Sequence, residues 1–224
     1  MIALIDGDMV SFRCAASAEG ESEAFIARAR VDSFIDEILA ATGCSEYEVW
    51  LSGDNNFRYN VYPEYKANRV GGYRPKWESE TLDHLRTVHN AQTIQGAEAD
   101  DALGYRAYQI GPDAIVVTND KDLKMIEGTH YDPVKKLLWT ISPEEANYWF
   151  YYQCLIGDPT DNIKGVPGIG PKNAERILSS CQTEEEMLQA VMNEYSCEEE
   201  FLMNAQCLWI FRKEGDVYKL DGGT

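Results

Sequence analysis

The chain has 224 residues, of which 44% are hydrophobic and 26% are charged, a composition typical of globular proteins. Thirty-eight acidic residues against twenty basic ones give a net charge of −18, so the molecule as a whole repels polyanions. The bulk charge therefore argues against a nucleic-acid partner unless a local cluster of cations offsets it. The length suffices for one sizeable α/β domain, alone or with a smaller helical addition.

Cysteine usage and the N-terminus indicate the setting of the protein. The six cysteines show no C-x-x-C spacing and no histidine partners at zinc spacing, so we expect reduced thiols and neither a disulfide framework nor a zinc site. We accordingly expect a cytoplasmic protein. The apolar run at residues 1–5 is too short for a signal peptide or a membrane span, so we expect no membrane partner. We also expect a monomer.

Short apolar runs alternate with helical patterns over the first part of the chain. Strands are predicted at residues 2–5, 48–51, 93–95 and 114–117, with an extended pair at 131–141. Helices are predicted between these strands, at 31–43, at 82–88 and from about residue 100. Such alternation is typical of βαβ units, so we predict an α/β fold with a mostly parallel sheet.

The second part of the chain is predicted to be helical. Ser142-Pro143-Glu144-Glu145 is a capping box with proline at the first helical position. Further helices are predicted at 174–178, 183–192 and 201–211, and the tail at 221–224 is expected to fray. We therefore predict an α/β core at residues 1–141, with a loop at about 62–80, and a helical region at 142–224, packed together as one compact unit.

Acidic residues recur where predicted strands end or helices begin. In an open parallel sheet, ligands bind in the crevice beyond the carboxyl ends of the strands. Carboxylates gathered there repel one another unless cations are present. Oxygen ligands suit Mg²⁺ or Mn²⁺, whereas zinc prefers His or Cys. We predict a divalent-metal site made of Asp6, Asp54, Glu98, Asp100, Asp101, Asp120, Asp122, Asp158 and Asp161.

A simpler explanation exists for some of these acids. Asp and Glu commonly begin helices, so helix capping explains Asp100 and Asp101 as well as metal binding does. The same holds for Asp8, because Asp6 is better placed at the end of its strand. The recurrence of acids in every βα unit favours the metal site for the set as a whole.

Two further stretches suggest contact with a phosphate backbone. Residues 65–77 are the most basic and aromatic part of the chain and contain Tyr65, Lys66, Arg69, Arg74 and Lys76; a solvated loop is the alternative explanation. Residues 165–170, Gly-Val-Pro-Gly-Ile-Gly, form a glycine-rich turn before Pro171-Lys172 and a helix. Glycines let backbone N–H groups approach a ligand, and a helix N-terminus attracts anions. Asp158 and Asp161, which precede this turn, suggest a metal site at which a phosphodiester is cut.

In this order the motifs resemble the flap-endonuclease-like 5′ nucleases, in particular bacteriophage 5′→3′ exonucleases and the bacterial polymerase-associated 5′ nuclease domain. The resemblance extends from residue 6 to about residue 172. It is carried by Asp6-Gly7, Tyr65-Lys66-Ala67-Asn68-Arg69, Glu98-Ala99-Asp100-Asp101, Asp120-Lys121-Asp122, and the sequence Gly157-Asp158-x-x-Asp161 with the glycine turn.

The resemblance implies a PIN-like, Rossmann-like three-layer core with a helical arch and a helix–three-turn–helix element. It implies hydrolysis of DNA near a 5′ end or at a flap, with two Mg²⁺ or Mn²⁺ ions. One ion would lie nearer Asp6, Asp54, Glu98 and Asp100, and the other nearer Asp101, Asp120, Asp122, Asp158 and Asp161. Lys66 and Arg69, beside Tyr65, would meet the scissile phosphate. The element at 165–170 would grip the DNA backbone through residues including Gly165, Val166, Gly168 and Gly170, often with a monovalent ion such as K⁺. From their charge we also expect Arg13, Arg74, Lys76 and Lys172 to contact DNA.

Some alternatives stay open at this point. A PIN-type ribonuclease would share the acids but would not need the glycine turn, and a non-catalytic duplex- or junction-binding module would gain nothing from so many carboxylates. The segment at 66–79 is short and contains glycines and a proline, so we expect a flexible loop in place of the arch. The sequence does not decide whether a free 5′ end threads through that loop.

Overall fold

A central six-stranded sheet organises the computed structural model, which describes residues 1–220. The strands lie in the order β3-β2-β1-β4-β5-β6, and all are parallel except β6, which is antiparallel to β5. The predicted α/β fold with a mostly parallel sheet is confirmed. The tail at 221–224 lies outside the described residues. The strands are β1 (Ile2–Asp6), β2 (Glu46–Ser52), β3 (Gln92–Ile94), β4 (Ala114–Val117), β5 (Gly128–Asp132) and β6 (Leu137–Ile141).

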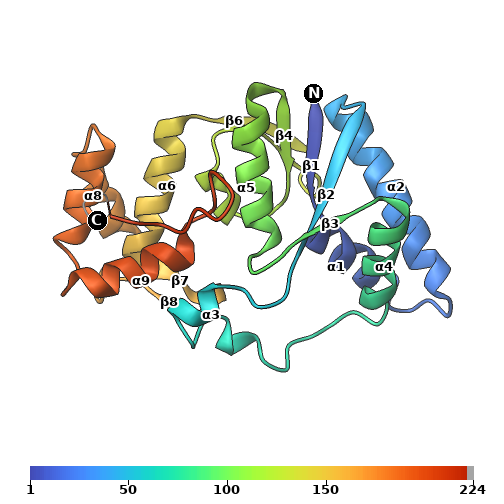
Figure 1. The fold of residues 1–224 in the computed structure, drawn as a ribbon, viewed down its shortest axis with the longest axis horizontal. Helices are drawn as coiled ribbons and strands as arrows, with labels where there is room; N and C mark the ends of the chain where they lie inside the picture. The colour runs from blue at the N-terminus through green and yellow to red at the C-terminus, as the bar shows by residue number, and fades with distance from the viewer. Residues whose placement is uncertain (221–224) are drawn as a thin grey trace.

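Helices cover both faces of the sheet and make a three-layer structure (Figure 1). On one face lie α1 (Gly7–Ser17), α2 (Ala24–Thr42) and α4 (Glu78–Val88), and on the other α5 (Ala99–Ile110) and α6 (Pro143–Ile156). Side chains along β1 alternate between the faces, as strand geometry requires. Ile5 packs in the apolar cluster with Val31 of α2, whereas Leu4 packs with Leu103 and Phe150 on the opposite face. The sheet is thus buried on both sides.

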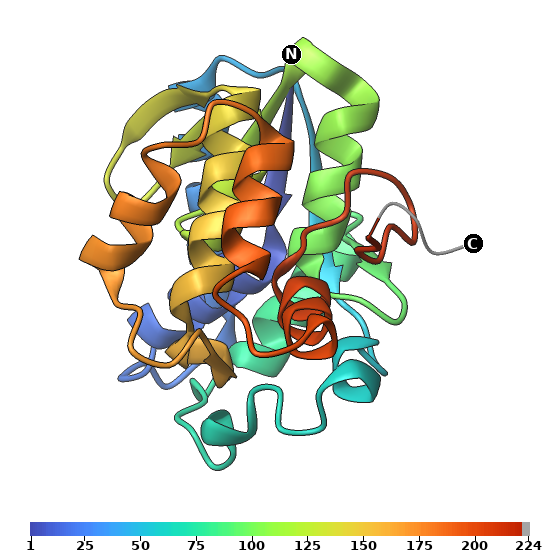
Figure 2. The same cartoon turned by 90° about the vertical axis from the view of Figure 1, so that its left-hand side faces the viewer.

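The chain after β6 packs as helices against the α5 side of the sheet (Figure 2). Ser142 caps α6 as predicted: its hydroxyl accepts from the Glu145 N–H, and the Glu145 carboxylate accepts from the Ser142 N–H at 2.8 Å. One apolar cluster joins this region to the core, and the division at residue 141 stays a prediction. The elements are a hairpin of β7 (Gly157–Asp158) and β8 (Ile163–Lys164), then α7 (Pro171–Leu178), α8 (Glu184–Met192) and α9 (Glu198–Leu208).

The structure differs from expectation around residues 65–77, the basic segment, and directly after β1. The helical arch implied by the resemblance is absent from the described chain. Residues 70–77 form neither helix nor strand, and before them lie only the short α3 (Arg58–Val61) and a 3₁₀ turn, η1 (Ala67–Arg69). Helix α1 was not predicted. It follows β1 without a linker because Asp6 serves as its N-cap, accepting from the Met9 N–H at 2.9 Å.

A buried ion pair connects three elements that are distant in the sequence. The Arg58 guanidinium binds both oxygens of Asp101, at 2.6 and 2.8 Å, and neither side chain is more than 1% exposed. Arg58 also donates to the backbone carbonyls of Cys207 and Trp209, at 2.8 and 2.7 Å, and so links α3 and α5 to the end of α9. Asp101 therefore lies away from the predicted metal site, with both of its carboxylate oxygens bound to Arg58.

Removal of one partner of this pair should destabilise the fold strongly. We expect Asp101→Asn to lower the free energy of unfolding by about 3–5 kcal/mol, because it leaves a buried guanidinium without its counter-charge. Glu48→Gln, which breaks a more exposed pair with Arg106, is the matched control and should cost about 1 kcal/mol or less. Urea denaturation measures both, and equal losses would contradict the structural role of Asp101.

Candidate active site

A cavity of about 1180 Å³ opens at the carboxyl edge of the sheet, where the acids were expected. It is lined by residues at the ends of β1 and β2, by the start of α5, by the loop after β4 and by the hairpin after α6. Seven of the nine predicted acids line it: Asp6, Glu98, Asp100, Asp120, Asp122, Asp158 and Asp161.

Short polar contacts fix the acids that follow β1 and β4. The Thr118 hydroxyl donates to Asp6 at 3.1 Å and accepts from the Asp120 N–H at 3.0 Å, so one side chain positions two acids. The Asp122 carboxylate accepts from the Gln153 side chain of α6 at 2.6 Å. These bonds orient the carboxylates before any ligand arrives.

The hairpin of β7 and β8 carries two more acids into the cavity. Its closure requires glycine at position 157, where φ is +71° and a Cβ atom would lie 2.2 Å from the backbone nitrogen of Gly165. Asp158 then accepts from the Lys121 ammonium at 3.0 Å. Oxygens of Asp122, Asp158 and Asp161 lie within 4.8 Å of one another, close enough to share a metal ion.

Burial, together with repulsion from neighbouring acids, raises the pKa of three of these carboxylates. Burial and the neighbouring Asp8 raise the pKa of Asp6 to about 7, and burial and Asp120 raise the pKa of Asp122 to about 7. Burial, Asp120 and Asp6 raise the pKa of Asp100 well above its ordinary value. A divalent cation bound among these groups would remove this repulsion, and the all-oxygen donor set fits such an ion.

The three residues predicted to be catalytic face the acids together. The Tyr65 hydroxyl lies 2.8 Å from Asp161 and 3.1 Å from Glu98. The Lys66 ammonium pairs with the same two carboxylates, and Arg69 pairs with Asp161. Although burial opposes it, the charges of Glu98 and Asp161 raise the pKa of Lys66. Lys66 is thus held as a cation beside Glu98 and Asp161, near the start of the basic segment.

The structure moves one predicted ligand out of the site and brings in another. Asp54 is exposed and does not line the cavity, because β2 ends at Ser52 and the chain then turns away through Asn55 at φ +59°. Asp8, in the first turn of α1, lines the cavity, and its carboxylate accepts from the Ser52 N–H at 3.0 Å. Asp8 therefore occupies the place beside the end of β2 that we predicted for Asp54. A prediction of α1 would have revealed this.

The predicted DNA-binding cations divide into two groups. Arg13 lines the cavity, with its guanidinium 5.4 Å from the centre of the Phe34 ring. Arg74 and Lys76 do not line it: Arg74 pairs with Glu78 at 3.1 Å, and the Lys76 ammonium stacks 4.1 Å from the Trp77 ring. These two cations are partly neutralised or stacked within the loop itself.

The glycine turn follows directly after the hairpin and leads into α7. Val166 is buried, and its N–H donates to the Leu155 carbonyl at 2.8 Å, which pins the turn to α6. Gly168 has φ +82°, and at both Gly168 and Gly170 an added Cβ would meet open space. Lys172 is exposed in the first turn of α7. Gly165 closes against the backbone of α6, so of the predicted set Gly168, Gly170 and Lys172 are the ones open to a ligand.

Sequence comparison connects this arrangement with known nucleases. The chain is 26% identical over 205 residues to the flap endonuclease Xni of Shewanella sp. (strain W3-18-1), covering 85% of this chain and 78% of the relative. It is 31% identical over 155 residues to a DNA polymerase I of Caldicellulosiruptor bescii, which is 59% of this chain but only 18% of that enzyme. No family model matches the chain.

Solved structures share the fold. The T5 5′-exonuclease with bound divalent metal ions (zinc) superposes with a TM-score of 0.72 at 19% identity, over 92% of this chain and 88% of that one. The catalytic core of Rad2 in complex with a DNA substrate superposes with a TM-score of 0.54 at 13% identity, over 99% of this chain and 83% of that one. The chain is a homologue of the flap-endonuclease-like 5′ nucleases. The resemblance found in the motifs is confirmed, and so is the PIN-like fold.

The exchange of Asp54 for Asp8 can be tested by metal binding. We expect Asp8→Asn to weaken Mn²⁺ binding by roughly tenfold or more, whereas Asp54→Asn, as the matched control, should leave it unchanged. Isothermal titration calorimetry on the folded, metal-free proteins measures both affinities. An unchanged affinity in Asp8→Asn, or a loss in Asp54→Asn, would contradict the assignment.

Proposed function

We propose that the protein is a divalent-metal-dependent 5′ nuclease that hydrolyses phosphodiester bonds at or near the 5′ end of duplex or flapped DNA. The observation that carries the proposal is the convergence of Lys66 and Arg69 on a cavity lined by acids from the sheet edge and from the hairpin. Carboxylates alone repel DNA, and cations alone would only bind it. Their combination suits metal-assisted hydrolysis.

The acids divide into two neighbouring groups that would hold two ions. Asp6, Asp8, Glu98 and Asp100 would hold one, and Asp120, Asp122, Asp158 and Asp161 the other. When bound, the ions would supply a water of lowered pKa and stabilise the leaving oxygen. Mg²⁺ is the ion we propose, with Mn²⁺ as its substitute, because the donors are oxygens throughout. K⁺ at the glycine turn belongs to the same proposal.

Lys66 and Arg69 would contribute the charge that the metal ions do not. In the described structure both are paired with Asp161, and Lys66 is paired also with Glu98. Ions bound to these carboxylates would compete with the two side chains, which would then be free to bind the phosphoryl oxygens of the substrate. They would stabilise the charge that develops there during hydrolysis. Tyr65 would keep Glu98 and Asp161 in place through its hydroxyl.

DNA is the substrate that the arrangement favours. The exposed backbone at Gly168 and Gly170, followed by Lys172 and the N-terminus of α7, suits the sugar–phosphate strand of a duplex. A duplex held there would extend past the hairpin of β7 and β8, which places Asp158 and Asp161 in the cavity. The homology to a flap endonuclease and to part of a DNA polymerase I supports the same substrate.

A cleavage assay separates this function from the alternatives. The protein is incubated with 5′-labelled duplex, flap DNA and an RNA hairpin, in Mg²⁺ or in EDTA, beside Asp120→Asn. We expect Mg²⁺-dependent release of short 5′ products from DNA and their loss in the variant. Cleavage of RNA alone would indicate a PIN-type ribonuclease, and binding without cleavage would indicate a junction-binding module; either result contradicts the proposal.

The role of Lys66 is tested by separating turnover from binding. We expect Lys66→Ala to lower single-turnover cleavage by at least about 100-fold, with a much smaller loss of DNA affinity, because its charge acts on the transition state. Lys76→Ala, on the same segment but outside the cavity, is the matched control and should retain its turnover. Equal losses of rate and affinity in Lys66→Ala would make it a docking residue only.

A further inference from the structure

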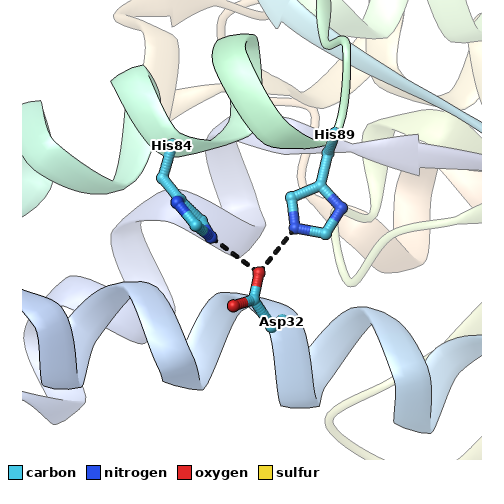
Figure 3. A group of neighbouring side chains, drawn as sticks. All are labelled: Asp32, His84 and His89. Atoms are coloured by element: carbon cyan, nitrogen blue, oxygen red, sulfur yellow. Dashed lines mark hydrogen bonds and ion pairs between the residues drawn. The ribbon is translucent and has the colours of Figure 1, made fainter.

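A second cluster of metal-binding side chains lies away from the acidic cavity, between α2 and α4 (Figure 3). It consists of Asp32 of α2, His84 of α4 and His89, the residue that ends α4. The Nε2 atoms of His84 and His89 both point to the same oxygen of Asp32, at 2.6 and 2.8 Å. Neither of the two histidines takes part in the function proposed above, and none of the three residues lines the acidic cavity.

We propose that Asp32, His84 and His89 bind a Zn²⁺ ion. Two imidazole nitrogens and one carboxylate oxygen, with a water in the fourth position, form one of the ligand sets that zinc adopts. The ligand atoms lie within 4.8 Å of one another, so one ion can reach all three. Imidazole nitrogens also favour Zn²⁺ over the Mg²⁺ expected among the carboxylates.

The surroundings of the histidines are those of a metal site. The Nδ1 atom of His89 lies 3.0 Å from the Tyr47 hydroxyl, an outer partner that fixes the ring and leaves Nε2 for the ion. The side chains of His84 and His89 are only 14% and 9% exposed, whereas that of Asp32 is 48% exposed and leaves an entry from solvent. The two histidines are thus largely buried, and the cluster is open to solvent at Asp32.

The present contacts are closer than a bound ion would leave them. Ligand atoms around tetrahedral zinc lie about 3.3 Å apart for bonds of about 2.0–2.1 Å, so the carboxylate must move outward by roughly half an ångström. Asp32 can do so, because it is the most exposed of the three. The alternative is a metal-free network in which both imidazoles donate to the carboxylate.

The ion would fasten α4 to α2 and so anchor one end of the basic segment. The basic segment, residues 65–77, runs from Lys66 beside the acids to the start of α4 at Glu78. With α4 fixed, movement of this segment on DNA binding would be confined to its middle, at residues 70–76. The site is independent of the proposed nuclease activity, since it needs neither the acidic cavity nor DNA.

Zinc binding to the full, metal-free chain tests the site, with excess Mg²⁺ present to occupy the acidic cavity. We expect one Zn²⁺ per chain and a thermal midpoint raised by about 5–10 °C at roughly 100 times the Kd. His84→Gln and His89→Gln should each weaken binding more than about tenfold, and Tyr47→Phe by about tenfold. Asp36→Asn, which removes an exposed acid one turn further along α2, is the matched control and should bind normally.

Cobalt absorption supplies a second readout that does not depend on stability. Co²⁺ bound by histidines in a four-coordinate site absorbs visible light far more strongly than Co²⁺ among carboxylates and water. We expect that band in the wild-type chain and its loss in His84→Gln. Two results would overturn the proposal: the absence of Zn²⁺ binding outside the acidic cavity when Mg²⁺ is in excess, or equal Zn²⁺ binding by the wild-type chain and both histidine variants. Asp32, His84 and His89 would then form a hydrogen-bonded triad only.

Discussion

Carboxylates that repel one another are held together at the carboxyl edge of the sheet. Buried carboxylates this close cannot all remain ionised without cations, as the raised pKa values of Asp6, Asp100 and Asp122 indicate. Rigid elements nevertheless hold them together: β1, the loop after β4, the start of α5 and the hairpin after α6. The fold thus maintains an arrangement that is unfavourable in the ion-free protein and favourable when divalent ions bind.

The same arrangement would allow a chain with a net charge of −18 to act on DNA as proposed. Four cations lie where the proposed substrate would approach: Lys66 and Arg69 against the acids, Arg13 in the cavity wall and Lys172 beyond the glycine turn. Elsewhere the negative surface disfavours non-specific contact with nucleic acid. The basic segment lies beside the acids. Lys66 and Arg69 would become available to phosphate only when metal ions replace them on Glu98 and Asp161.

Much of the fold could be predicted because its signals are local. β4 has the predicted bounds, the Ser142 capping box is present, and seven acids meet at the predicted edge. Each follows from composition and spacing within a few residues. The parallel sheet then brings together acids that are distant in the sequence.

The structure departs from the predicted site where a partner from elsewhere in the chain decides the position of a residue. Asp101 is removed from the site by Arg58, 43 positions earlier, and nothing local distinguishes it from Asp100. Asp54 is turned outward because β2 ends two residues before it, and Asp8 takes that place through an unpredicted helix. His84 and His89 have no familiar zinc spacing, because the end of α4 lies between them and their third partner comes from α2.

We propose that the acids at the sheet edge hold two divalent ions beside Lys66 and Arg69, and anomalous scattering from crystals grown with Mn²⁺ and a 5′-phosphorylated duplex can locate these ions. We expect two Mn²⁺ peaks in the acidic cavity, with Lys66 turned to a phosphate. One peak should lie beside Asp6, Asp8, Glu98 and Asp100, and the other beside Asp120, Asp122, Asp158 and Asp161. Peaks bound by Asp54 or Asp101, or a cavity without Mn²⁺ in which Lys66 still pairs with Glu98, would contradict this proposal.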